Sequence, residues 1–197
     1  ETFDWAWSYK DHGKGHFTVF HKVHPPGYQW LHDRFGTNWR MTEMQAAIGR
    51  VQLGKLDGWV ARRRRNAGLL AGRLGTVPGV GIESPGPDFF HAYYKLYVTL
   101  EPGALARGWS RDRVVAEINA AGLPCLAGVC PEMYREQAFV RAGYVPEKPF
   151  PVARDLGSRS LLLLVHPTLT DEDLHRYAGA VERVLHSALR NPGAIDP

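Results

Sequence analysis

The stretch that organises this sequence is Gly36-Thr37-Asn38-Trp39-Arg40-Met41-Thr42-Glu43-Met44-Gln45-Ala46-Ala47-Ile48-Gly49. It joins a short polar turn to the start of a helix. Thr42 is a good N-cap, and Gln45 completes a capping box in which each side chain satisfies a backbone N–H of the other residue. Glu43 adds a negative charge to the first turn, where the helix dipole favours it. Asn38 and Arg40 precede this helix start and can present polar groups to a ligand.

The helix that begins at Glu43 carries apolar residues on two faces. One stripe contains Ala46, Gly49, Leu53, Leu56 and Val60, and the other contains Met44, Ala47, Ile48 and Val51. A helix of this kind is buried between two layers or at a subunit interface. We expect it to continue through Arg62–Arg65 to about Leu74, where Gly75 and Pro78 end it.

The composition is that of a soluble globular protein, with 44% hydrophobic and 22% charged residues in a chain of 197. Two cysteines, Cys125 and Cys130, form neither a ligand cluster nor a disulfide framework, which favours a reducing cytoplasm. The longest aliphatic run, Leu161 to Val165, is too short to cross a bilayer. We therefore expect a cytoplasmic protein with no membrane partner. The first residues show no signal-peptide pattern and no initiator methionine, so we expect the chain to begin inside a longer one.

The remaining pattern predicts a small α+β layer domain of the α/β class. Residues 2–10 are expected to be helical, and 12–35 are expected to form a loop rich in histidine, glycine and aromatics. Further helices are predicted at 111–121, after the cap Ser110, and after the cap Thr170, with a helical turn near 132–142. Three strands are predicted, at 94–100, 123–127 and 160–165. The glycine- and proline-rich connector 75–90 predicts two domains, 1–75 and 76–197.

Two clusters invite functional interpretations that the patterns do not favour. Five histidines between His12 and His32 have no metal-ligand spacing and no supporting cysteine or carboxylate cluster, so loop or ligand contacts are favoured over a metal site. Arg62–Arg65 are consecutive, and on a helix they point all round the axis. A solvated, ion-paired surface is therefore favoured over a phosphate-backbone patch, and no nucleic-acid partner is expected.

The spacing of residues does not decide the roles of His166 and of the pair Asn38 and Arg40. His166 directly follows a buried strand, where a side chain can reach a cleft, but it can equally make a local hydrogen bond. Asn38 and Arg40 can secure the turn before the helix, or they can hold a phosphate at its N-terminus. No glycine-rich phosphate loop, nucleophile elbow or paired-carboxylate motif is present.

The motif Gly36-x-Asn38-x-Arg40-Met41-Thr42-Glu43-x-Gln45-Ala46-Ala47, followed by Gln52-Leu53, resembles the DegT/DnrJ/StrS-type family of pyridoxal 5'-phosphate (PLP)-dependent sugar aminotransferases. Supporting segments stand in the same order in this chain: Lys10-Asp11-His12-Gly13, Arg62–Arg65, His91–Tyr97 and Leu161–Leu174. The resemblance covers nearly the whole sequence. It implies the C-terminal part of a fold-type I transferase, with a long connecting helix and a small domain of about three strands packed by helices.

The resemblance also implies a reaction and a site. Family members transfer an amino group, commonly from glutamate or glutamine, to a keto group on a nucleotide-activated sugar, in polysaccharide or antibiotic sugar biosynthesis, and PLP is the electron sink. They work as homodimers with a shared active site. By resemblance, Asn38 contacts the PLP phosphate from the neighbouring subunit and Arg40 lies nearby. His12 and His166 are candidates for the substrate side.

The resemblance also identifies what is missing from this chain. The family's Schiff-base lysine motif precedes the His-Gly segment and cannot be placed here, and Lys10 and Lys14 are poor substitutes. We therefore expect that the chain alone has no transaminase activity and contains no catalytic residue. Two alternatives remain: a PLP-dependent sugar dehydratase relative, and a non-catalytic truncated dimerisation module.

Overall fold

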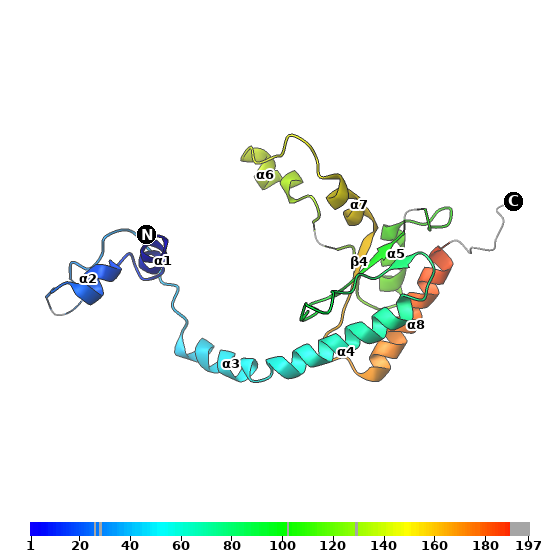
Figure 1. Cartoon of the computed structure of the whole chain (residues 1–197), viewed down its shortest axis with the longest axis horizontal. Helices are drawn as coiled ribbons and strands as arrows, with labels where there is room; N and C mark the ends of the chain where they lie inside the picture. Colours follow the sequence, from blue (N-terminus) through cyan, green and yellow to red (C-terminus); the bar gives the residue numbers. More distant parts are fainter. Residues whose placement is uncertain (26, 28, 102, 129, 190–197) are drawn as a thin grey trace. The chain divides into compact units, whose positions relative to one another are not determined.

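The computed structural model describes residues 1–25, 27, 29–101, 103–128 and 130–189. The chain divides between Lys55 and Leu56 into two compact units, which are described separately (Figure 1). The domain boundary predicted between 75 and 76 stays a prediction. No helix in the described ranges is long and apolar enough to span a membrane.

The first unit contains the helices α1 (Thr2–Lys10), α2 (His16–His21) and α3 (Glu43–Leu53). Helix α1 confirms the helix predicted at 2–10. Helix α2 lies inside the stretch predicted to be a loop, so that prediction was wrong for six residues. A helix this short shows no periodicity in the sequence, and Gly15 at its start makes no side-chain cap.

Helix α3 begins as the sequence predicts. The Thr42 hydroxyl accepts a hydrogen bond from the Gln45 backbone N–H at 3.2 Å, and the Gln45 side chain accepts one from the Thr42 N–H at 2.9 Å. The helix then ends at Leu53, and α4 (Leu56–Leu74) begins after a turn. The Gly54 N–H still bonds the Arg50 carbonyl as in a helix, but the Lys55 N–H bonds the Gln52 carbonyl, only three residues back, and the helix predicted to continue to about Leu74 is interrupted at this turn.

The second unit is built on a four-stranded antiparallel sheet. Its strands are β1 (Val80–Gly81), β2 (Leu96–Leu100), β3 (Cys125–Leu126) and β4 (Ser160–Leu163), in the order β1-β2-β4-β3. Strands β2, β3 and β4 correspond to the three predicted strands. Strand β1 was not predicted because it is only two residues long and lies inside the glycine- and proline-rich connector.

Three helices cover one face of this sheet: α4, α5 (Arg111–Ala120) and α8 (Asp171–Ala188) (Figure 1). The Ser110 and Thr170 caps predicted for α5 and α8 are both present. Leucine and valine side chains from alternate positions of β2 and β4 pack against these helices, and the hydrophobic core includes Leu96, Val98, Leu161, Leu163, Leu70, Ile118 and Val181. Alternation along a strand sends the intervening side chains to the other face.

That other face, called here the outer face, carries Tyr97 and Thr99 of β2. Helix α7 (Pro151–Arg159) borders it and leads directly into β4. The segment before α7 contains the one-turn helix η1 (Met133–Arg135) and α6 (Gln137–Arg141), in the region where a helical turn was predicted. Helix α7 itself was missed, although Pro151 at its first turn is a common start signal.

Candidate functional site

Two motif segments that are distant in the sequence lie side by side in the first unit. Asp11 and Asn38 form an antiparallel bridge. The His12 N–H donates to the Thr37 carbonyl at 2.9 Å, and the Trp39 N–H donates to the Lys10 carbonyl at 3.0 Å. The structure therefore brings His12, Asn38 and Arg40 onto one pair of backbone segments, whereas His166 belongs to the second unit.

Two glycines permit this close pairing. Gly13 has φ +83, and a Cβ added there would lie 1.7 Å from the Arg34 carbonyl oxygen. A Cβ on Gly36 would lie 2.3 Å from the backbone nitrogen of Gly13. No side chain fits at either position, because the two backbones touch each other there. These are the glycines of the His-Gly segment and of the Gly-x-Asn-x-Arg motif.

A buried carboxylate anchors the arrangement. Asp11 is only 4% exposed, and its carboxylate binds the Arg40 guanidinium and, at 3.4 Å, the Lys14 ammonium. Burial raises the pKa of Asp11, but the hydrogen bond from Arg40 and the charge of Lys14 outweigh it, so the net pKa lies below its ordinary value. Asp11 thus stays ionised and fixes Arg40. Asp11 belongs to the Lys10-Asp11-His12-Gly13 segment, but its role depends on Arg40, which is distant in the sequence.

Asn38 and Arg40 form a set of hydrogen-bond donors. The Asn38 side-chain oxygen accepts the Arg40 backbone N–H at 3.3 Å, and the Asn38 amino group is the hydrogen-bond donor of the same side chain. Both side chains are exposed, and the Arg40 side chain is 50% exposed despite its bond to Asp11. An amide N–H beside a guanidinium suits a phosphate group. This donor set fits the phosphate of PLP.

The nearby lysines are engaged elsewhere. The Lys14 ammonium pairs with Asp11, and the Lys10 ammonium lies 5.5 Å from the centre of the Trp7 ring. His12 is exposed and has φ +58, an uncommon conformation for a residue other than glycine.

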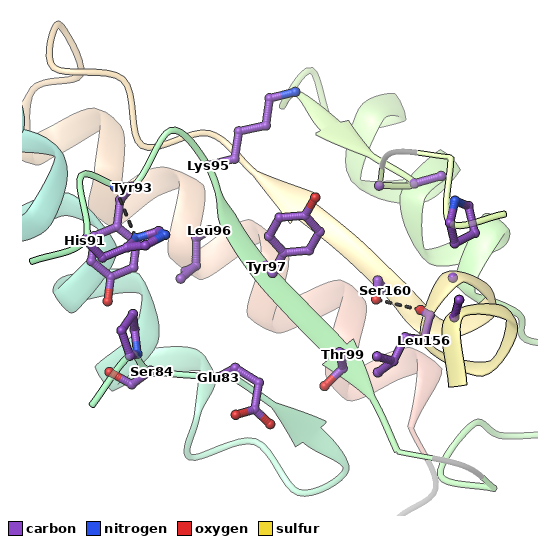
Figure 2. Close-up of a pocket in the computed structure, with 16 residues that line it drawn as sticks. Glu83, Ser84, His91, Tyr93, Lys95, Leu96, Tyr97, Thr99, Leu156 and Ser160 are labelled. Carbon is purple, nitrogen blue, oxygen red and sulfur yellow. Dashed lines mark hydrogen bonds between the residues drawn. The ribbon is translucent and has the colours of Figure 1, made fainter. Parts of the chain in front are cut away.

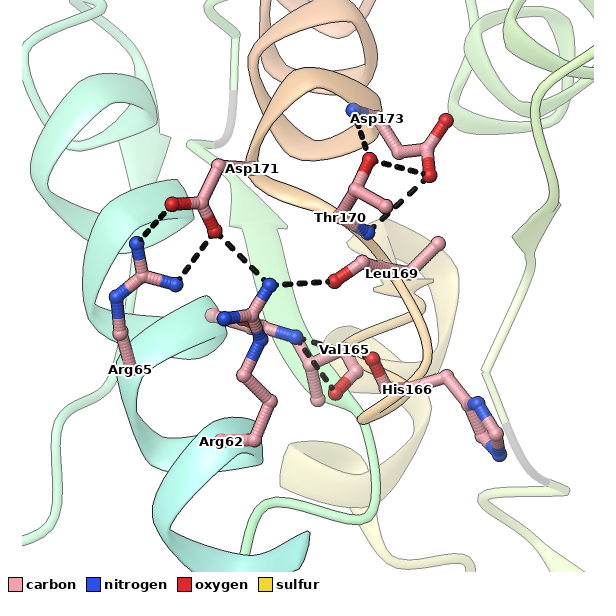
Figure 3. A network of polar contacts seen from close by, with 9 residues as sticks. Arg62, Arg65, Val165, His166, Leu169, Thr170, Asp171 and Asp173 are labelled. Atoms are coloured by element: carbon pink, nitrogen blue, oxygen red, sulfur yellow. Dashed lines mark hydrogen bonds and ion pairs between the residues drawn. The ribbon is translucent and has the colours of Figure 1, made fainter.

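His166 follows β4 and is exposed. Its ring Nδ1 lies 2.7 Å from the Thr168 hydroxyl, so the local hydrogen bond considered from the sequence is present and Nε2 is left for another partner. Helix α4 holds the same loop: the Asn66 amino group donates to the His166 carbonyl at 3.0 Å, and Arg62 donates to the Leu169 carbonyl at 2.8 Å (Figure 3). Asn66 is completely buried.

The four consecutive arginines of α4 contact different groups of the same unit. Arg62 and Arg65 bind Asp171 at the start of α8 (Figure 3). Arg63 donates to the carbonyls of Tyr93 and Tyr94, and Arg64 donates to the carbonyl of His91. The predicted ion pairing is confirmed. Hydrogen bonds from Arg65 lower the pKa of Asp171.

A cavity of about 630 Å³ lies against the outer face of the sheet in the second unit (Figure 2). Tyr97 and Thr99 lie along β2, and Glu83 and Lys95 bring two opposite charges to the lining. The cavity has no signature in the sequence, because its walls come from four segments that only the fold brings together. Across the described ranges, no group of three or more histidine, cysteine or acidic side chains could hold a metal ion.

The chain has the fold of the C-terminal part of a fold-type I aminotransferase, as its structural similarity to a solved aminotransferase shows. A sequence model of the DegT/DnrJ/EryC1/StrS aminotransferase family matches residues 11–182, and the chain belongs to this family. The fold class predicted from the sequence is confirmed.

Individual relatives agree with this assignment. A solved structure of an aminotransferase from Psychrobacter cryohalolentis is 42% identical, with a TM-score of 0.83 over 94% of this chain and 49% of that one. The erythromycin biosynthesis sensory transduction protein EryC1 of Saccharopolyspora erythraea is 31% identical over 73% of this chain and 37% of its own length. The dTDP-3-amino-3,4,6-trideoxy-alpha-D-glucose transaminase of Streptomyces venezuelae is 29% identical, covering 78% and 38%. The chain thus spans less than half the length of these relatives.

Proposed function

We propose that this chain is the C-terminal part of a PLP-dependent aminotransferase that acts on a nucleotide-activated keto sugar. The family match over residues 11–182 supports the reaction class, and the name of the Streptomyces venezuelae relative supports the substrate class. The amino group would come from an amino acid such as glutamate. When bound, PLP supplies the electron sink for the amino transfer.

The observation that carries this proposal is the Asp11–Arg40–Asn38 arrangement. Asp11 fixes the Arg40 guanidinium, and the Arg40 N–H orients the Asn38 side chain, whose amino group would donate to the cofactor phosphate. Hydrogen bonds to a charged group are stronger than those between neutral groups. His12 lies on the adjacent segment, and the Nε2 atom of His166 can bind another partner. We propose that both histidines contact the substrate.

We further propose that the active site is shared between two copies of the chain in a homodimer. Helix α3 buries none of its own residues within this chain. Its apolar stripes are open to solvent, with Met44 76% and Ile48 57% exposed. A second subunit covering α3 would bury these side chains, and it would do so next to the turn that carries Asn38.

The free cysteines Cys125 and Cys130 support a cytoplasmic location.

A phosphate titration tests the cofactor half of the proposal. The probe is pyridoxine 5'-phosphate, which has no aldehyde and cannot react with surface lysines, followed by phosphorus NMR. We expect saturable binding to the chain, weakened about tenfold or more by Asn38→Ala because a charge-assisted hydrogen bond is lost. Gln52→Ala on the same helix is the matched control. Equal binding by Asn38→Ala, or equal binding of pyridoxine without phosphate, contradicts the assignment.

The absence of a reactive lysine is tested separately. We expect that PLP followed by borohydride labels no single lysine of this chain preferentially, and that no transaminase activity is measured. One lysine labelled together with an absorbance band of bound PLP would overturn this expectation. Reading the gene upstream of Glu1 then separates an aminotransferase from the alternatives, since an in-frame lysine motif supports transamination and a replaced lysine supports dehydration.

A further inference from the structure

The loop between β4 and α8 presents the His166 ring in one defined state. We propose that Thr168 is a positioning residue, which orients this ring and fixes its proton on Nε2, so that His166 donates a hydrogen bond to an oxygen atom of the sugar substrate. The inference rests on the proposed function, because that function places His166 in contact with the substrate. It adds the residue that orients the ring and the chemistry that the ring can perform.

Two helices hold the backbone of this loop. The Asn66 side chain of α4 is completely buried, and its amino group donates to the Val165 carbonyl at 3.5 Å and to the His166 carbonyl at 3.0 Å. The Leu164 N–H donates at 3.3 Å to the hydroxyl of Tyr177, a buried residue of α8. The backbone at His166 is therefore fixed from both sides, whatever its own ring contacts.

A tight turn then brings Thr168 back to the His166 ring. The Leu169 N–H donates to the His166 carbonyl at 3.2 Å, and Arg62 donates to the Leu169 carbonyl at 2.8 Å. Inside this turn the Thr168 N–H lies 3.4 Å from Nδ1 of His166, and the Thr168 hydroxyl lies 2.7 Å from the same atom. The N–H and the hydroxyl of Thr168 thus converge on one nitrogen of the ring.

These two contacts decide which ring nitrogen carries the proton. A backbone N–H can only donate, so the Nδ1 atom that it faces must accept and carries no proton. The Thr168 hydroxyl can rotate, and it then donates to the same nitrogen. In a neutral imidazole the proton lies on the other nitrogen. His166 therefore presents an Nε2–H group.

The Nε2 side of the ring is open to a ligand. His166 is exposed, and in Figure 3 its ring points away from the contacts that join α4 to α8. Within the described part of the chain its hydrogen bonds are made through Nδ1. An Nε2–H group requires an acceptor, such as a keto, hydroxyl or phosphate oxygen of a nucleotide sugar. The neutral ring in this state cannot accept a proton from the substrate at Nε2, because that nitrogen already carries one.

Heteronuclear NMR of the histidine rings tests the proposal in the full chain at pH 8, where histidine is ordinarily neutral. We expect the His166 signals to show a protonated Nε2 and an unprotonated Nδ1, and His166→Gln identifies these signals by their loss. Thr168→Val removes the hydroxyl and should raise the ratio of the Nδ1–H to the Nε2–H form about fivefold, the effect of losing one neutral hydrogen bond. Thr168→Ser keeps the hydroxyl and should restore the original ratio.

A second histidine of the same unit provides an internal control. The N–H of Tyr93, a residue in a strained left-handed conformation at φ +49, donates to Nδ1 of His91 at 3.2 Å. His91 should therefore also carry its proton on Nε2, and it should do so in every Thr168 variant. Thr76→Val is the matched substitution, because the Thr76 hydroxyl is exposed and donates to the Arg73 carbonyl. It should leave both rings unchanged.

Two results overturn the inference. One is a proton on Nδ1 of His166 in the unmodified chain, and the other is a Thr168→Val ratio equal to that of Thr76→Val. The substrate contact is tested by adding dTDP-glucose, which should shift the Nε2–H signal of His166. If this signal does not move while the proton stays on Nε2, the proposed substrate contact fails and the role of Thr168 in orienting the ring stands. Asn38→Ala should leave the His166 signals unchanged, so a failure of the cofactor proposal is recognised separately.

Discussion

Asp171 accepts hydrogen bonds on both carboxylate oxygens from Arg65, at 2.6 and 2.5 Å, and so joins the start of α8 to α4. The same carboxylate also accepts one from Arg62 at 2.9 Å. A negative charge in the first turn of α8 is further favoured by the helix dipole. One side chain therefore serves a helix terminus and two guanidinium groups.

We expect Asp171→Asn to lower the urea midpoint of the second unit at pH 7. Hydrogen bonds from Arg65 lower the pKa of Asp171 below its ordinary value of 3.8 in the folded state. As the pH falls, Asp171 therefore takes up a proton in the unfolded chain before it does so in the folded one. The stabilisation that ionised Asp171 provides is complete above the ordinary pKa. It is lost as the pH falls through the lowered pKa of the folded state. The difference between the two proteins should shrink between pH 7 and pH 3. Glu172→Gln, one residue along α8, is the control, and an equal shift in that variant would contradict the prediction.

Gly13→Ala should destabilise the first unit by about 2 kcal/mol or more, since alanine is strained at φ +83. The added Cβ would also meet the Arg34 carbonyl oxygen at 1.7 Å, so the paired segments would separate. Hydrogen exchange of the His12 amide, which bonds the Thr37 carbonyl, reports this directly. Gly49→Ala, in open space on α3, should be neutral or stabilising by up to about 1 kcal/mol. Unchanged protection of His12 in Gly13→Ala would show that the pairing does not depend on this glycine.

The proposed dimer predicts concentration-dependent association of the chain. Ile48→Asp places a charge in the exposed apolar stripe of α3 and should raise the dimer dissociation constant about tenfold or more. Sedimentation equilibrium measures it. Arg50→Gln changes the polar side of the same helix and should have little effect. A chain that stays monomeric at all concentrations, or an Ile48→Asp variant that associates normally, contradicts the proposal.

The two cysteines should differ in reactivity. Cys125 is 2% exposed in β3, and burial raises its pKa to about 11, so little thiolate forms at pH 8. The thiol of Cys130 is exposed. Brief treatment with iodoacetamide should therefore label Cys130 alone, with mass spectrometry as the readout, and both cysteines should be labelled in urea. Labelling of Cys125 at the rate of Cys130 in the folded chain would show that β3 opens readily.

Local signals in the sequence predicted local structure well. The capping boxes at Thr42 and Thr170 and the cap at Ser110 are formed by residues three apart, and all three are present. Of the elements that were missed, α2 and β1 are too short for periodicity to mark them, and α7 has no side-chain cap although Pro151 stands in its first turn. Gly54 was visible in the sequence, but a glycine inside a helical pattern does not by itself end the helix.

Long-range relationships were beyond the sequence pattern. The motif resemblance selected Asn38 and Arg40, but the buried Asp11 that fixes Arg40 lies 29 residues earlier and was given no role. The cavity around Tyr97 depends on which strands are neighbours and which face α7 borders. Neither is encoded in the spacing of any one segment, because each depends on how separate segments pack.

The four arginines of α4 also set a limit on how this chain can change. Successive residues of a helix are rotated by about 100°, so Arg62 to Arg65 reach Asp171 and the strained loop at Tyr93 in a single fixed orientation. Inserting or deleting one residue between Arg65 and Leu70 would turn every guanidinium away from its acceptor while Leu70 stays in the core. Insertions in this helix should thus be far less tolerated than substitutions. The conformation of the loop at Tyr93 depends on the length of α4 as well as on its arginines.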